Sequence, residues 1–336
     1  MKKLLTLALG CTLLYACNPD TPAPAPTPVT PTQPKVEVKV PTFNAQNAYD
    51  LIQKQVDFGP RVPKTKEHQA CLNWLVQQLK DYGTEVKVQE GIVNSFLDPK
   101  MPVKNIIATI NPEKTNRVLL CAHWDTRYVA DQESDASKQK TAILGADDGG
   151  SGVAVLLEIA RIIQENPINL GVDIVLFDVE DQGEPEWITP TNKYTSMWCL
   201  GSQYWAKNTN GYRAKFGILL DMVGSRGATF PKEGISMRYA GLFVDKIWKE
   251  AYALGYNDYF ITPRQYRDIT DDHLFVNEFA KIPTVDIINL PEGSRTGFGG
   301  HWHTQNDNMS IIDKNTLQAV GTTVLNVLYK EAAGEL

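Results

Sequence analysis

Apolar runs and amphipathic segments alternate along most of this chain. Six short apolar runs predict buried strands, at residues 86–88, 104–110, 117–122, 172–177, 216–220 and 284–288. Five longer segments carry apolar residues at helical spacing and predict helices, at residues 44–56, 66–81, 151–164, 242–254 and 314–329. Strands that are apolar throughout and separated by helices are typical of a mostly parallel sheet with helices on both faces. We therefore expect residues 42–336 to form a single α/β domain of this kind.

The first 41 residues do not follow this pattern. Lys2 and Lys3 precede an apolar stretch, residues 4–14, that is too short to span a bilayer. The stretch ends in Leu14-Tyr15-Ala16-Cys17, which resembles a bacterial lipoprotein signal whose cysteine carries the lipid. Residues 18–41 are rich in proline and predict an extended linker. We expect residues 1–17 to be a signal peptide ending in lipidated Cys17. The chain would then be exported and anchored to a membrane, on the periplasmic or cell-surface side of a bacterial envelope.

Composition and charge exclude several other classes of protein. The net charge is −6 and no basic stripe is present, so a nucleic-acid partner is not expected. Of the five cysteines, Cys11 would leave with the signal and Cys17 would carry the lipid. Cys71, Cys121 and Cys199 remain, and they can form at most one disulfide. No pair has the CxxC spacing of a cysteine-built zinc site.

Ionisable side chains gather where the predicted strands stop. They are His123 and Asp125, Asp148 in a glycine-rich turn, Glu180 and Asp181, Asp221, and His303 near the end of the chain. Taken singly, a carboxylate after a strand is often only a helix cap, and a paired aspartate in such a turn usually serves the turn. Their joint occurrence, with four of the five histidines in these loop segments, points to one crevice beyond the carboxyl ends of the strands.

The side chains in this set suit a zinc enzyme. Zinc takes imidazole nitrogen and carboxylate oxygen ligands, and a catalytic site keeps one position open. Asp148, Asp181 and His303 would supply two oxygens and one nitrogen. Glu180 is next to the proposed ligand Asp181, and a carboxylate beside a metal can move protons.

The order of these residues resembles the zinc aminopeptidases with two co-catalytic metals, and more closely the glutaminyl cyclases that share their fold. The resemblance runs from Gly59 to the end of the chain. Its most specific stretches are residues 122–127, 177–181, 198–205, 271–273 and 302–304, and the Trp198–Trp205 stretch is similar to bacterial cyclases of Bacteroidetes-type organisms. The resemblance implies a zinc aminopeptidase-like fold and cyclisation of N-terminal glutamine on peptides and proteins, with release of ammonia.

Residue roles follow from this resemblance by position. Asp148, Asp181 and His303 would bind one zinc ion per chain, Glu180 would be the general acid and base, Asp221 and Asp271 would be its acidic partners, and Trp302, Phe298 and Trp187 would line the substrate pocket. One position departs from the family, which commonly has a second glutamate where this chain has Asp181. Aspartate is one methylene shorter, so the metal or the loop must shift to meet it.

Two alternative functions remain open at this stage. A two-zinc aminopeptidase would use His123, Asp148, Asp181, Asp221 and His303, and all five positions carry ligand side chains. Ligand identity therefore does not separate it from a cyclase. The cyclase is favoured by Trp302 before His303, by the 271–273 element and by the 198–205 stretch. A non-catalytic peptide-binding lipoprotein is the second alternative, but it would have no need for Glu180.

Overall fold

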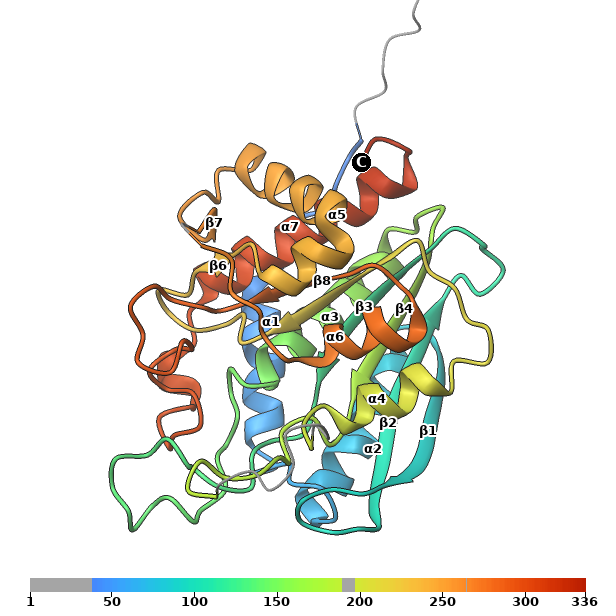
Figure 1. Cartoon of the computed structure of the whole chain (residues 1–336). Helices are drawn as coiled ribbons and strands as arrows, with labels where there is room; N and C mark the ends of the chain where they lie inside the picture. The colour runs from blue at the N-terminus through green and yellow to red at the C-terminus, as the bar shows by residue number, and fades with distance from the viewer. Residues whose placement is uncertain (1–37, 189–196, 264) are drawn as a thin grey trace, which may run out of the picture. The chain divides into compact units, whose positions relative to one another are not determined.

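A six-stranded mixed sheet forms the centre of the molecule (Figure 1). The computed structural model describes residues 38–188, 197–263 and 265–336, so the predicted signal and most of the linker lie outside it. In spatial order the strands are β1 (Glu85–Val93), β2 (Met101–Ile110), β4 (Gly171–Phe177), β3 (Arg117–His123), β5 (Phe216–Asp221) and β8 (Thr284–Ile288). The last four run parallel to one another, while β1 and β2 are antiparallel. The predicted mostly parallel sheet is confirmed, with an antiparallel hairpin added at one edge.

Helices cover both faces of the sheet. The larger layer contains α1 (Ala45–Val56), α2 (Lys66–Asp81), α3 (Gly150–Glu165), α5 (Gly234–Ala253) and α7 (Lys314–Ala332). The opposite face carries α4 (Leu200–Lys207), α6 (Asp272–Phe275) and a π-helical turn, Val276–Ala280. Three further short elements are β6 (Phe230–Pro231), β7 (Phe260–Ile261) and the 3₁₀ turn Met309–Ile311. None of the helices in the described ranges has the length and apolar character that a bilayer crossing requires.

Strand β3 shows why its sequence is apolar throughout. Val118 and Leu120 pack into the core under the larger helical layer, whereas Leu119 and Cys121 pack on the opposite face. Successive side chains of a strand point to opposite faces, so a strand covered on both sides needs apolar residues at every position. This double burial is the reason that continuous apolar runs identified the central strands.

The sequence pattern missed the first turns of α5 and the short helical elements, of which α4 is the longest. Helix α5 begins at Gly234 rather than at residue 242, and its backbone leaves helical geometry at Ala240. That kink interrupts the regular spacing on which the prediction depended. Helix α4 was also not predicted. It is only eight residues long, and its N-cap residue Cys199 makes no side-chain capping bond.

The parallel strands bring the predicted site residues to one edge of the sheet. His123 at the end of β3 pairs with Phe177 at the end of β4, and Asp221 ends β5 opposite Ile288 of β8. The loops that follow β3, β4 and β5 therefore leave the sheet from the same edge.

Candidate metal centre and active site

The loop after β4 is shaped by a buried carboxylate, Asp125. Its two oxygens accept hydrogen bonds from the backbone N–H of Glu180 at 3.0 Å and of Asp181 at 3.2 Å, and from the Gln182 side chain at 2.9 Å. Since Asp125 is fully buried, these bonds satisfy a charge that would otherwise be costly to bury. Asp125, predicted only as part of a motif, thus anchors the backbone that carries Glu180 and Asp181.

The turn that presents Asp148 is held in a similar way. Asp307 accepts hydrogen bonds from the backbone N–H of Asp147 and Asp148, at 2.7 and 3.2 Å. The buried Arg61 donates to the carbonyls of residues 124, 144 and 145. Gly149 lies so close to His123 that a Cβ atom there would overlap the histidine carbonyl. These contacts leave Asp148 little freedom to move.

Three predicted ligands converge on one point. Ligand atoms of Asp148, Asp181 and His303 all lie within 4.8 Å of one another, and all three side chains are buried. His303 Nε2 is 3.1 Å from Asp181 Oδ1 and 3.8 Å from Asp148 Oδ2. Both carboxylate oxygens of Asp181 are buried, and neither has a hydrogen-bond partner among the described residues. Unpartnered buried carboxylate oxygens facing an imidazole suit a divalent cation, so this donor set fits zinc.

Asp131 supports the metal centre and was not predicted. Its Oδ1 lies 3.1 Å from His303 Nδ1, and its Oδ2 accepts a bond from Arg127 at 2.6 Å. Burial alone would raise the pKa of Asp131, but His303 and Arg127 hold that pKa well below its usual range. An ionised Asp131 orients the His303 ring so that Nε2 faces Asp148 and Asp181. Nothing in the sequence around residue 131 distinguishes it from a surface loop.

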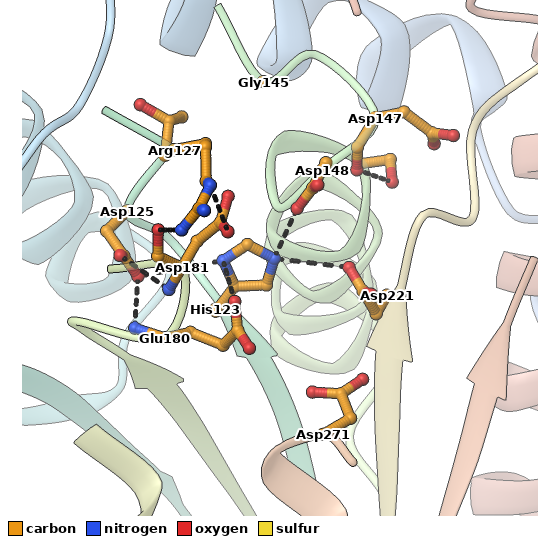
Figure 2. Close-up of polar contacts among 12 residues, drawn as sticks. His123, Asp125, Arg127, Gly145, Asp147, Asp148, Glu180, Asp181, Asp221 and Asp271 are labelled. Carbon is orange, nitrogen blue, oxygen red and sulfur yellow. Dashed lines mark hydrogen bonds and ion pairs between the residues drawn. The ribbon is translucent and has the colours of Figure 1, made fainter. Parts of the chain in front are cut away.

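A second cluster is built on His123. Its Nε2 lies 3.0 Å from Asp148 Oδ1 and 3.3 Å from Asp221 Oδ1, and Figure 2 shows both carboxylates facing the ring. Burial works against a charged ring, but hydrogen bonding to Asp125, Asp148 and Asp221 raises the pKa of His123 well above its ordinary value. These residues could hold the second metal of an aminopeptidase. In this structure the His123 imidazole contacts the carboxylates of Asp148 and Asp221 directly.

Glu180 lies beside buried acids and the buried Cys199 thiol. Cys199 Sγ donates to Glu180 Oε1 at 3.1 Å, and Asp271 lies within 4.8 Å of this pair (Figure 2 shows Glu180 and Asp271). Burial, together with the neighbouring carboxylates, raises the pKa of Glu180 well above its usual value. Burial likewise raises the pKa of Asp221, to about 8. Of the two predicted acidic partners, Asp271 joins the Glu180 cluster and Asp221 joins the His123 cluster.

These groups open onto a cavity of about 330 Å³. Asp148, Glu180, Asp181 and His303 line it together with aromatic side chains. The Trp302 ring stacks on His303 at 3.8 Å between centroids and contacts Phe298 at 4.5 Å, and both aromatic residues line the cavity.

Trp187, the third aromatic residue predicted to line the substrate pocket, does not line this cavity. Trp187 is 45% exposed and lies outside the cavity lining, where Trp198 is found instead. Trp187 is followed by residues 189–196, which are not among those described, so its role in substrate binding stays a prediction.

The other three histidines have structural partners. His68 contacts Asp178 at 2.8 Å, His273 contacts Glu233 at 3.1 Å and His301 contacts Asp147 at 2.8 Å. His123 and His303 are the two histidines, all five being in the described ranges, whose ring nitrogens lie within 4 Å of the Asp148 carboxylate.

Comparison with known proteins agrees with this geometry. Residues 105–328 match peptidase family M28. The chain belongs to peptidase family M28.

Solved structures and a curated relative refine the comparison. The chain is 51% identical to the Tannerella forsythia glutaminyl cyclase, covering 86% of this chain and 99% of that one, with a TM-score of 0.83. It is 49% identical to a Zn-dependent exopeptidase from Parabacteroides distasonis, with coverages of 87% and 99% and a TM-score of 0.84. A glutaminyl-peptide cyclotransferase of Drosophila melanogaster is 26% identical over 278 residues, covering 76% of this chain and 73% of the relative. The predicted fold, the similarity to glutaminyl cyclases and the zinc requirement are thereby confirmed.

Proposed function

We propose that this chain is a zinc-dependent glutaminyl-peptide cyclotransferase, which converts the N-terminal glutamine of peptides and proteins to pyroglutamate and releases ammonia. One observation carries the proposal: the Glu180 carboxyl, whose side chain is 13% exposed, and the Asp148, Asp181 and His303 set open onto the same aromatic-lined cavity. The similarity to the Tannerella forsythia glutaminyl cyclase, with 51% identity, and to the Drosophila melanogaster glutaminyl-peptide cyclotransferase supports this proposal.

The reaction requires one bond to form and one to break. The free α-amine forms a bond to the γ-carboxamide carbon, closing a five-membered ring, and the bond from that carbon to its amide nitrogen breaks. Asp148, Asp181 and His303 would hold the zinc ion, which would supply Lewis acidity for the γ-carboxamide group. Glu180 takes a proton from the attacking amine and returns it to the leaving nitrogen, which departs as ammonia.

The aromatic walls serve a reaction in which water is not a reactant. Trp302 and Phe298 form an apolar aromatic surface beside His303, and an indole can cover a small planar group such as a carboxamide. A low-dielectric pocket also keeps the pKa of the Glu180 carboxyl high, because burial disfavours the charged form. Glu180 can therefore hold a proton between its two transfers.

A direct assay tests the proposal. The purified chain is incubated with a peptide that begins with glutamine, and ammonia release is followed together with the loss of about 17 mass units that ring closure causes. The same peptide with an acetylated N-terminus is the control, because it has no free amine to attack. Release of ammonia only from the free peptide is expected. Release of free glutamine instead would support a peptidase.

The two-zinc aminopeptidase remains the second candidate. The His123, Asp148 and Asp221 cluster supports it, and so does the similarity to a structure described as a Zn-dependent exopeptidase. Metal analysis separates the two functions, since one zinc ion per chain is expected of the cyclase and two of the peptidase. A chain that bound no zinc would instead favour the non-catalytic peptide-binding lipoprotein.

We also propose that the enzyme is exported and anchored to a bacterial membrane through lipid on Cys17. The Lys2-Lys3 start, the short apolar stretch and the Ala16-Cys17 junction support this localisation. The test expresses the full chain and its Cys17→Ser variant in bacteria fed a labelled fatty acid. Label and membrane association are expected for the unaltered chain and not for the variant. Equal membrane association of both would refute the lipid anchor.

A further inference from the structure

Cys199 is held next to Glu180 by the backbone, independently of its own side chain. Its N–H donates to the carbonyl of Glu180 at 2.8 Å, and the N–H of Leu200 donates to the carbonyl of Val179 at 3.0 Å. Cys199 also has a left-handed backbone, with φ of 57°, immediately before α4. Non-glycine residues adopt this conformation rarely, and it concentrates at functional sites. Because backbone bonds set its position, the thiol is free to serve a separate purpose.

Within the described part of the chain, the Cys199 thiol donates one hydrogen bond, and its acceptor is the proposed proton carrier. Cys199 Sγ donates to Glu180 Oε1 at 3.1 Å, which is short for a bond to sulfur. The side chain is completely buried, and burial next to Glu180 raises the pKa of the Cys199 thiol well above its ordinary value. The group therefore stays a protonated donor and does not become a thiolate nucleophile.

The neighbours of Glu180 explain why a neutral donor is useful here. Asp271 lies within 4.8 Å of the Glu180–Cys199 pair, and His123 Nδ1 comes no closer than 4.0 Å to Glu180 Oε2. A carboxyl group surrounded by other acids has few donors with which to fix its orientation. The thiol supplies such a donor to Oε1, whereas the contact of His123 with Oε2 is longer, at 4.0 Å.

We propose that Cys199 is a positioning residue for Glu180: its thiol holds Oε1 so that Oε2 is kept available to exchange the proton in ring closure. This inference rests on the proposed cyclase function. It concerns a contact in the fold, so it can also be tested without turnover.

The kinetic test compares Cys199→Ala, which loses the donor, with Cys199→Ser, which retains one. Cys199→Ala is expected to lower kcat about tenfold, as loss of one hydrogen bond to a reacting carboxyl would, with KM and zinc content unchanged. Cys199→Ser is expected to restore kcat to within about threefold of the unaltered enzyme. A merely structural role would not produce a kcat-only loss that serine rescues.

A matched control separates this effect from the cost of a cavity. Cys121 is also a fully buried free cysteine, but it packs in the apolar core of β3. Cys121→Ala removes the same thiol volume and is expected to leave kcat unchanged. The proposal is overturned if Cys199→Ala retains full kcat, or if the serine variant loses as much as the alanine variant.

A spectroscopic test does not depend on activity or on the stability of the alanine variant. The S–H stretching band of Cys199, identified by its absence in Cys199→Ser, is expected at a lowered frequency because the thiol is hydrogen-bonded. In Glu180→Ala, which removes the acceptor, the band is expected to move toward that of Cys121. An unshifted band would overturn the proposal. If the unaltered enzyme released no ammonia, the cyclase function would fail while this measurement still decided the contact.

Discussion

Glu180 is the residue on which proton transfer depends in the proposed reaction. Glu180→Gln keeps the shape of the side chain but cannot accept and return a proton. We expect kcat to fall by about 10²-fold or more, with zinc still bound, because general acid–base catalysis contributes on that scale. Ammonia release and metal content are measured on the same preparation.

The control for this variant is Glu184→Gln, which removes a carboxylate from the same loop but outside the cavity lining. It should retain the kcat of the unaltered enzyme. Full activity of Glu180→Gln at full zinc occupancy would show that another group carries the proton.

Asp131 affects the metal centre indirectly, through its contact with the His303 ring. Asp131→Asn removes the negative charge that faces Nδ1 of the ring. We expect zinc affinity to fall by about 10- to 100-fold, the usual consequence of losing a carboxylate behind a metal-binding histidine. Competition with a coloured zinc chelator measures this affinity. Asp135→Asn is the matched control, because Asp135 lies in the same loop but is half-exposed. If the unaltered chain and both variants bound zinc with equal affinity, Asp131 would have no role at the metal centre.

At the scale of elements, the start of helix α5 depends on one buried carboxylate. Glu233 accepts hydrogen bonds from the backbone N–H of Ile235, Ser236 and Ile269, and it contacts His273 at 3.1 Å. Burial alone would raise the pKa of Glu233, but His273 and the backbone donors lower that pKa to about 2. The ionised form is therefore more stable in the folded chain than in the unfolded one.

A stability prediction follows for Glu233→Gln. At pH 7 the variant is expected to lose about 1–3 kcal/mol of unfolding free energy, because charge-assisted bonds are replaced by weaker ones. Since the folded pKa is depressed, the advantage of the unaltered chain is fully present above about 4.5 and is lost as the pH falls toward about 2. Urea unfolding at pH 7 and at about pH 3.5 measures the difference. Glu113→Gln, at an exposed glutamate, should show no such pH-dependent gap. A gap that stayed constant with pH would argue against an ionised cap.

At the scale of the whole molecule, zinc joins segments that are far apart in the chain. Asp148 precedes α3, Asp181 follows β4, and His303 lies between β8 and α7. A ligand that binds only the folded state stabilises it, by about 2.7 kcal/mol when free ligand is 100-fold above Kd. We expect chelation to abolish activity and lower Tm, and added zinc to restore both. Scanning calorimetry over a series of free zinc concentrations measures the shift. A Tm independent of zinc would mean that the three side chains do not hold the ion in the folded chain.

The sequence by itself determined the sheet and the set of chemical groups at its edge. Apolar runs identified the central strands because those strands are buried on both faces, and parallel strands bring the residues after them to one edge. Asp148, Asp181, His303 and Glu180 could therefore be grouped before any coordinates were known. The resemblance to glutaminyl cyclases then supplied roles for them.

Only the tertiary structure decided which side chains touch. Asp131 reaches His303 and Asp125 reaches the loop after β4, across many residues of chain, and neither contact leaves a periodic pattern in the sequence. The kink in α5 and the left-handed residue before α4 concealed helical segments for the same reason, since both interrupt regular spacing. The exposure of Trp187 and the contact of Cys199 with Glu180 likewise depend on how loops pack against one another. Hydrophobic periodicity reports burial, whereas hydrogen bonds between distant loops depend on distances that only the packed chain defines.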